Sequence, residues 1–278
     1  MNKRTFLKTA AALSVAAVFG TASFSALADT KVIRVGVVGD YNAQWETVNE
    51  LLAKDNLKVK LIKFSDYATP NRALDDGDID LNAFQHKAYL ANDIARNGYK
   101  IKDIGDTLIA PLAVFPNKNK IKSIKDIKDG DKIAIPSDLT NGGRALKVLE
   151  EAGLIEVDPA KGYVPTKADI TKYNVKIKIV EAESGILARL LPDVSAALIN
   201  GGNAFTAGLN PAKDSIFTET VDPQKNPNVA KLVNVIVART KDASNPDYIK
   251  VVKAYQSKKT AETLLKAYSG AFIPAFKY

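Results

Sequence analysis

The sequence predicts an α/β protein in which two α/β lobes are joined by a two-segment hinge. Segments typical of strands and of helices alternate along the chain, and the breaker Pro116-Asn117 separates two such series. A further apolar run at residues 234–239 follows the second series. Alternating strands and helices indicate βαβ units around a mainly parallel sheet. Two series linked by two crossings of the chain favour two lobes, although one large doubly wound domain fits the same alternation.

The first series contains β-branched or alternating apolar runs, which predict strands, and apolar residues at helical spacing, which predict helices. Its expected strands lie at residues 31–38, 57–64 and 79–84, and its expected helices at residues 45–54, 70–76 and 86–97. The apolar run at residues 112–115 predicts a strand that leaves this lobe. We therefore expect one hinge segment near Phe115.

The second series begins after the breaker and has the same character. Its expected strands lie at residues 132–135, 175–180 and 195–200, and its expected helices at residues 124–127, from the loop 136–144 to near Gly153, and at 185–191. Residues 234–239 predict a strand that returns to the first lobe through a hinge near Leu232, before helices at 246–257 and 260–268. The expected division is lobe 1 at residues 29–115 and 233–278, and lobe 2 at residues 116–232.

The first 28 residues have the three parts of a secretory signal peptide. A basic head at residues 3–8 precedes an apolar and small-residue stretch at 9–24 and an Ala26-Leu27-Ala28 site. The stretch is too short and too rich in Ala and Ser to favour a membrane span. We expect cleavage before Asp29, by the general route or by a twin-arginine route in which Lys3 replaces the first arginine.

Cysteine content and charge limit the location and the partners. The chain has no cysteine, so neither a disulfide nor a lipid attached through a thiol is expected. A soluble periplasmic protein without an anchor follows. Loss of three basic signal residues would lower the formal net charge from +8 to +5, and lysines alternate with acids in segments such as residues 121–130. This pattern indicates a solvated surface, so no nucleic-acid partner is expected.

The residue types present exclude most catalytic and metal sites. His86 is the sole histidine, so sites built from several histidines or from a cysteine and a histidine are excluded. The sequence contains no G-x-S-x-G elbow, phosphate loop or dinucleotide fingerprint. A triad of His86 with Ser65, Ser137 or Ser184 stays formally open. We expect no metal, no cofactor and no catalysis.

Four polar and aromatic loops follow predicted strands. They are Phe64-Ser-Asp-Tyr67, Asn82-Ala-Phe-Gln-His-Lys-Ala-Tyr89, Thr140-Asn-Gly-Gly-Arg144 and Asn200-Gly-Gly-Asn203. Ligands of open α/β sheets bind outside the carboxyl ends of the strands, so these loops are candidates for a ligand site. The alternative is that the tyrosines are surface aromatics, Phe84 is core and Asn200-Gly201 is a turn.

Several segments closely resemble the NlpA family of methionine-binding lipoproteins. They are Phe64-Ser-Asp-Tyr-Ala-Thr-Pro-Asn-Arg-Ala-Leu74, Asp80-Leu-Asn-Ala-Phe-Gln-His-Lys-Ala-Tyr-Leu90, Ile135-Pro-Ser-Asp-Leu-Thr-Asn-Gly-Gly-Arg-Ala-Leu146, Ala197-Leu-Ile-Asn-Gly201, Ala254-Tyr-Gln-Ser257 and Gly270-Ala-Phe-Ile-Pro-Ala-Phe276. They extend over nearly the whole chain after the signal segment, and the second and third are highly specific to the family. The resemblance implies a bilobed periplasmic binding protein of type II-like fold.

The resemblance also implies a site. Its residues for the apolar side chain of the ligand are Tyr67, Phe84, His86 and Tyr89, which would surround a thioether. Its residues for the polar end are Arg144, which would take the α-carboxylate through two parallel bonds, with Asn141, Asn200 and Asn234.

The function implied is that of the substrate-binding component of a methionine ABC importer. L-methionine is the leading ligand, with D-methionine or a methionine-containing dipeptide as additional ones. The expected partners are this small-molecule amino-acid ligand and an ABC permease with its ATPase at the inner membrane, and the protein is expected to be a monomer. A second hypothesis keeps the fold but changes the ligand to another small amino acid, peptide or organic anion. A remote third is an enzyme with His86 as base.

This chain departs from the family pattern in two loops and in its lack of a lipidated cysteine. The family commonly has a Gly-Pro-His turn after the first strand and Asn-Gly-Asn-Tyr in the later segment, where this chain has residues 39–45 and Asn200-Gly-Gly-Asn203. Gly202 removes a side chain and Asn203 replaces an aromatic, which predicts a roomier or more polar cleft. Tyr41 or Trp45 could line it instead, with Trp45 favoured as the first core residue of its helix.

Overall fold

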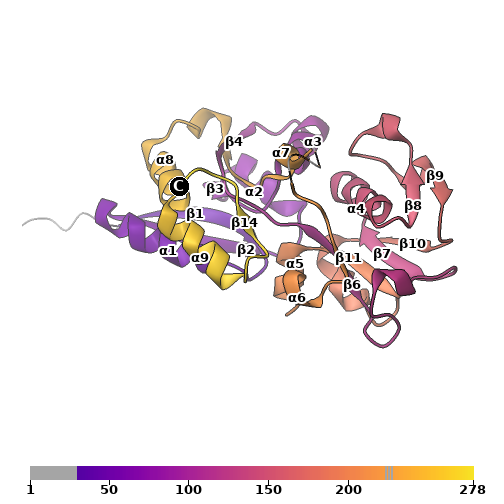
Figure 1. Cartoon of the computed structure of the whole chain (residues 1–278). Helices are drawn as coiled ribbons and strands as arrows, with labels where there is room; N and C mark the ends of the chain where they lie inside the picture. Colours follow the sequence, from indigo (N-terminus) through magenta and orange to yellow (C-terminus); the bar gives the residue numbers. More distant parts are fainter. Residues whose placement is uncertain (1–29, 223, 225, 227) are drawn as a thin grey trace, which may run out of the picture.

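Two five-stranded sheets, one in each lobe, organise the structure (Figure 1). The computed structural model describes residues 30–222, 224, 226 and 228–278. The signal peptide expected at residues 1–28 therefore lies outside the described residues. The bilobed α/β class expected from the sequence is confirmed.

The first sheet has a parallel core with one reversed strand. Its strands lie in the order β2 (Leu57–Phe64), β1 (Lys31–Val38), β3 (Leu81–Asn82), β13 (Val235–Arg239) and β4 (Ile101–Asp106). Strand β1 pairs in parallel with β2 and β3, whereas β13 is antiparallel to both of its neighbours. Side chains of β13 are buried on both faces, which explains why its sequence is a continuous apolar run.

Helices cover both faces of the first sheet. One face packs against α1 (Ala43–Leu52), α8 (Pro246–Tyr255) and α9 (Lys258–Ala267), and the other against α2 (Thr69–Asp76) and α3 (Lys87–Asn97). Alternate residues of β13 pack into the two cores. Ile236 and Ala238 pack on the face covered by α1, α8 and α9, and Val235 and Val237 pack on the face covered by α2 and α3. Burial on both faces makes β13 an interior strand that contributes to both cores of the lobe.

The second sheet repeats this arrangement. Its strands lie in the order β10 (Lys178–Ala182), β7 (Lys132–Pro136), β11 (Ala196–Asn200), β6 (Leu112–Pro116) and β12 (Phe217–Thr218). Strand β6 is antiparallel to both neighbours, as β13 is in the first sheet. One face packs against α4 (Leu139–Glu151) and the hairpin of β8 (Ile155–Val157) and β9 (Ile170–Tyr173). The other packs against a 3-10 helix, Ser184–Leu190, and α5 (Gly201–Thr206).

Shorter elements complete the chain. Strand β5 (Leu108–Ile109) pairs with β14 (Ile273–Pro274), α6 (Pro211–Asp214) precedes β12, and α7 (Val229–Leu232) precedes β13. The remaining 3-10 turns lie at Ala53–Asp55, Ile124–Asp126, Pro159–Lys161, Lys167–Asp169 and Thr240–Asp242. No helix within the described residues is long and apolar enough to cross a membrane.

The lobe boundary expected at Phe115 is wrong. Residues 112–115 were expected in lobe 1, but they form most of β6, which lies in the second sheet between β11 and β12. Each strand that follows a crossing is inserted into the sheet of the lobe that it enters. The first crossing therefore precedes Leu112. A short apolar strand has the same pattern in either sheet, so the sequence alone does not show which one it joins.

Candidate functional site

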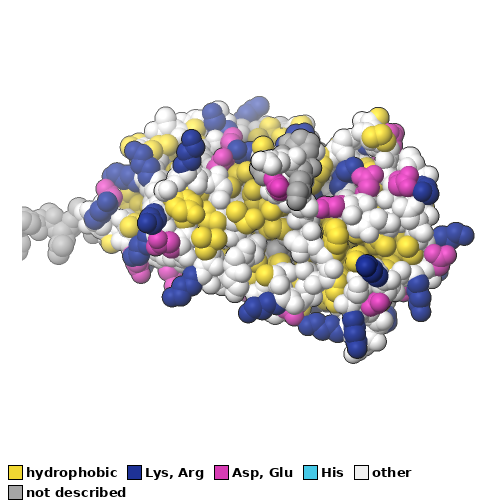
Figure 2. Space-filling view, in the orientation of Figure 1, with side chains coloured by type: hydrophobic (Ala, Val, Ile, Leu, Met, Phe, Trp, Pro, Cys, Tyr) yellow, Lys and Arg dark blue, Asp and Glu magenta, His cyan; other side chains and the backbone are white. Residues whose placement is uncertain are grey.

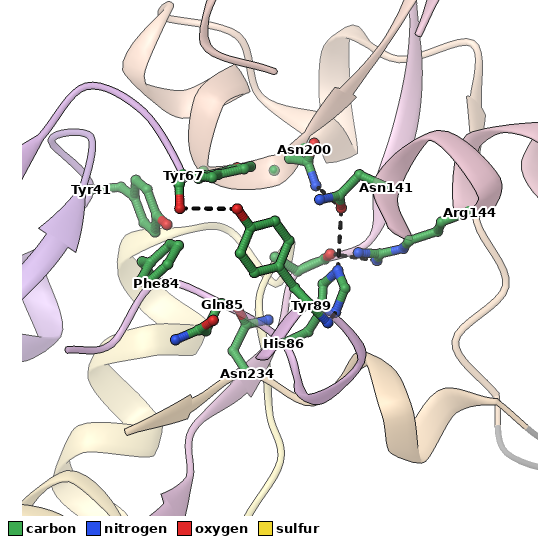
Figure 3. Close-up of a pocket in the computed structure, with 13 residues that line it drawn as sticks. Tyr41, Tyr67, Phe84, Gln85, His86, Tyr89, Asn141, Arg144, Asn200 and Asn234 are labelled. Atoms are coloured by element: carbon green, nitrogen blue, oxygen red, sulfur yellow. Dashed lines mark hydrogen bonds between the residues drawn. The ribbon is translucent and has the colours of Figure 1, made fainter. Parts of the chain in front are cut away.

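A cavity between the lobes brings together all eight residues that the sequence predicted for a ligand site. It contains about 380 Å³ of empty space, part of which is open to solvent. Thirteen residues line it: the predicted Tyr67, Phe84, His86, Tyr89, Asn141, Arg144, Asn200 and Asn234, together with Tyr41, Gln85, Ala110, Gly201 and Gly202 (Figure 3). Pockets with aromatic walls and a few polar groups are typical sites for small molecules.

The ends of strands in both lobes supply these side chains. Tyr67 follows β2, Phe84 follows β3, and Tyr89 lies in the first turn of α3. Asn200 ends β11 in the second lobe, where Arg144 lies in the second turn of α4. The arrangement agrees with the rule that ligands of α/β sheets lie at the carboxyl ends of strands.

Three aromatic rings form one end of the cavity. The ring centroids of Tyr67, Phe84 and Tyr89 are 5.9–6.0 Å apart. The Tyr89 hydroxyl donates to the Tyr67 carbonyl at 3.0 Å, and Asn203 Nδ2, from the second lobe, donates to the Tyr67 hydroxyl at 3.1 Å. These contacts fix the rings, so this end presents an apolar, polarisable surface.

A chain of amide hydrogen bonds begins at Asp138 and ends in the cavity, where Figure 3 shows the link between Asn141 and Asn200. Asp138 caps α4, and Asn141 Nδ2 donates to both of its carboxylate oxygens at 3.1 Å. A carboxylate only accepts, so the Asn141 oxygen must point away from it, where it accepts from Asn200 Nδ2 at 2.8 Å. Asn200 Oδ1 is thereby left buried without a hydrogen-bond partner among the described residues. The site thus contains an acceptor that requires a donor.

His86 is neutral, and its neighbours determine its tautomer. Nδ1 accepts the Tyr89 backbone N–H at 3.1 Å, so the ring proton lies on Nε2, which faces Asn141 Oδ1 at 3.2 Å. Burial, aided by the charge of Arg144, lowers the pKa of His86 to about 4. The single lone pair of the ring is occupied by a backbone donor, which disfavours the hypothesis that His86 is a catalytic base.

Arg144 is already paired within the protein. Both its side chain and that of Glu219 are 1% exposed, and Nε donates to the two Glu219 oxygens at 2.9 and 3.1 Å. Nη2 donates to Glu219 Oε2 at 2.6 Å and to the Ala110 carbonyl at 2.9 Å. The two parallel bonds expected with a ligand carboxylate are therefore made with Glu219. Nη1 has no hydrogen-bond partner within the part of the chain that is described, and it retains two N–H donors.

Sequence reasoning missed Glu219 as a functional residue. It lies 75 residues from Arg144 along the chain and directly after β12. The available signal was general: an arginine that is buried in a protein requires an acidic partner. The sequence contains many acids, and it does not show which one the fold brings to Arg144.

No group of three or more His, Asp or Glu side chains placed to hold a metal ion occurs among the described residues. The profile of the family described as NlpA lipoprotein matches residues 33–276. The chain belongs to the NlpA lipoprotein family.

Similar proteins include members with methionine in their names. The D-methionine-binding lipoprotein MetQ of Salmonella typhimurium is 41% identical over 88% of this chain and 89% of its own. The outer membrane lipoprotein 3 of Mannheimia haemolytica is 39% identical over 96% of this chain and 98% of its own. A solved structure of a nutrient binding protein from Burkholderia cenocepacia bound to methionine is 39% identical, with a TM-score of 0.81 over 88% of this chain and 100% of that one.

The two loops that depart from the family pattern meet in the structure. A Cβ atom at Gly202 would lie 2.4 Å from the hydroxyl and ring carbons of Tyr41. The Tyr41 ring packs edge-on against Phe272, with centroids 5.4 Å apart. Gly202 therefore makes room for Tyr41, which lines the cavity, so this side is not simply roomier. Trp45 is 2% exposed in the core of the first lobe and does not line the cavity.

The pKa of His86 predicts a pH dependence of stability. Between about pH 6.5 and pH 4 the unfolded chain binds a proton that the folded chain excludes, so the free energy of unfolding should decrease as the pH falls through this window. The full effect is roughly 3 kcal/mol. Denaturant unfolding at a series of pH values, for the wild type and His86→Gln, measures it. The difference in stability between the two should be constant above pH 7 and shrink below 6.5; parallel profiles would contradict the assignment.

Proposed function

We propose that this protein binds methionine between its lobes and delivers it to an ABC permease and its ATPase in the inner membrane. The observation that carries the proposal is that one cavity has an aromatic end and a polar end. The polar end contains Arg144 and the Asn200 oxygen, which has no hydrogen-bond partner among the described residues. The names of the relatives support the same ligand class. L-methionine is the leading ligand, and D-methionine and a methionine-containing dipeptide are additional candidates.

The proposed pose uses the chemistry of each end. The thioether lies among Tyr67, Phe84 and Tyr89, with His86 beside them, because sulfur makes contacts of about 0.3–1.5 kcal/mol each with aromatic rings. The ammonium donates to Asn200 Oδ1, and the carboxylate accepts from Arg144 Nη1.

The other two asparagines have different proposed roles. Both ends of the Asn141 amide are engaged within the protein, so Asn141 would act by orienting Asn200 and His86. Within the described residues, the Asn234 side chain makes one long hydrogen bond, 3.5 Å from Nδ2 to the Leu232 carbonyl, and it can turn toward the polar end of the ligand. Asn234 also adjoins the second chain crossing, which would connect ligand contact to hinge closure.

The proposed role is transport without catalysis. The ligand would contact residues of both lobes, so binding would favour the closed form that a permease detects. No cofactor, metal or nucleic acid is required, and basic and acidic side chains are interspersed on the face shown in Figure 2. A monomer suffices, because one chain supplies every residue of the cavity.

Ligand-dependent unfolding tests the ligand class. Any ligand that binds only the folded state stabilises it by about 2.7 kcal/mol at a hundredfold excess over its Kd. We expect methionine to raise the melting temperature more than the other amino acids, methionine dipeptides and organic anions in a panel.

Asn200→Ala should weaken the binding of all α-amino acids alike, by about ten- to a hundredfold, because it removes an acceptor for the ammonium. Phe84→Ala should instead change their ranking. A panel in which only non-amino-acid ligands raise the melting temperature would refute the proposal.

Close approach of Gly202 and Tyr41 predicts a coupling between the lobes. Gly202→Ala should weaken methionine binding about tenfold, because the added methyl group meets the Tyr41 ring when the lobes are closed. Tyr41→Ala should reduce that loss when the two changes are combined. Isothermal titration of the two single variants and the double variant measures the coupling. Strictly additive losses would show that the two residues do not interact in the bound form.

We propose further that the mature protein starts at Asp29 and lies free in the periplasm. The signal features of residues 1–28 and the absence of cysteine support this location. Osmotic shock without detergent should release the protein, with an intact mass that corresponds to residues 29–278. Retention of the first 28 residues, or an added lipid mass, would contradict the prediction.

A further inference from the structure

A carboxylate behind the cavity wall balances the one charged residue of that wall. Among the thirteen lining residues, Arg144 is the one with a formal charge at neutral pH, since His86 is neutral. Glu219 lies directly behind Arg144, and three hydrogen bonds join the two side chains. The cationic group that faces the ligand is therefore neutralised before any ligand enters.

Glu219 is held in place by more than Arg144. The Tyr163 hydroxyl donates to Oε1 at 2.7 Å, and the Leu112 backbone N–H donates to Oε2 at 3.2 Å. Burial alone would raise the pKa of this carboxyl, but the charge of Arg144 and these hydrogen bonds hold it below its usual value. Glu219 therefore stays ionised, in a fixed position, at neutral pH.

We propose that Glu219 is a positioning residue that makes the cavity select amino-acid zwitterions over organic anions. An anion would bring an unbalanced negative charge into a dehydrated space near a fixed carboxylate. A zwitterion adds no net charge, and its ammonium meets an acceptor, Asn200 Oδ1, that lacks a donor among the described residues. Glu219 also uses Nε and Nη2 of Arg144, which directs Nη1 to the ligand. The inference rests on the proposed function, since it concerns the charge of the ligand in the same cavity.

Two ligands that differ only in the amino group provide the test. Methionine and 4-(methylthio)butanoate share the thioether chain and the carboxylate, and isothermal titration at pH 7 gives the ratio of their affinities. In the wild type, methionine should bind at least about a hundredfold more tightly. In Glu219→Gln, which keeps the shape but removes the negative charge, that ratio should fall by about tenfold or more. Glu219→Asp retains the charge and should restore much of the selectivity.

The matched control is Glu156→Gln. Glu156 is an exposed acid on β8 of the same lobe, paired with Lys172, and its loss should leave the ratio unchanged. A purely structural role for Glu219 would weaken both ligands equally. A folded Glu219→Gln protein whose ratio stays within threefold of the wild type would overturn the inference and leave the proposed function intact.

A wild-type measurement can still overturn the inference if Glu219→Gln does not fold. The anion should then bind far more weakly than methionine to the unaltered protein, and an anion that binds within threefold of methionine would overturn the inference. A wild type that binds neither methionine nor any other amino acid would overturn the proposed function and this inference together.

Discussion

The buried ion pair of Arg144 and Glu219 connects the chain segments that meet behind the cavity. Both side chains are 1% exposed, so either charge alone would be strongly unfavourable, and loss of one partner from such a pair typically costs 3–5 kcal/mol. The pair also joins three parts of the chain. Arg144 lies on α4 and bonds to Ala110 before β6, whereas Glu219 follows β12 and accepts from Leu112. The two crossings between the lobes and the wall of the cavity thus share one hydrogen-bonded unit.

One carboxylate also determines how the polar groups of the cavity point. Asp138 accepts from Asn141 Nδ2, and this orients the Asn141 oxygen toward Asn200 and His86. The orientation of the Asn200 amide follows from that one choice, and it leaves Asn200 Oδ1 without a donor among the described residues. The Asn141 oxygen also accepts the Nε2 proton of His86, whose tautomer the Tyr89 backbone N–H sets. Asp138 does not line the cavity, yet it sets the polarity that a ligand would meet.

Much of the fold and of the site could be predicted from the sequence. Runs such as β1 and β2 were predicted with their observed bounds, because β-branched alternation is a local property. The eight candidate residues, which share one cavity, could be predicted because the resemblance covers the whole loops that carry them. Glu219 and the contact between Tyr41 and Gly202 could not be predicted, since both depend on which distant segments meet. The same reason explains β6: hydrogen bonding to β11 decides its lobe, and its own residues do not.

The insertion of β13 between β3 and β4 affects the order in which the fold can be completed. The second sheet comes from one continuous stretch, from β6 to β12, whereas β4 in the first sheet has β13 as its neighbour. During synthesis from the amino terminus, the later lobe has all its strands while the earlier one still lacks the strand between β3 and β4. Until residues 235–239 emerge from the ribosome, β3 and β4 have unpaired edges. A nascent chain cut short before that point lacks an interior strand of a sheet and not a dispensable tail.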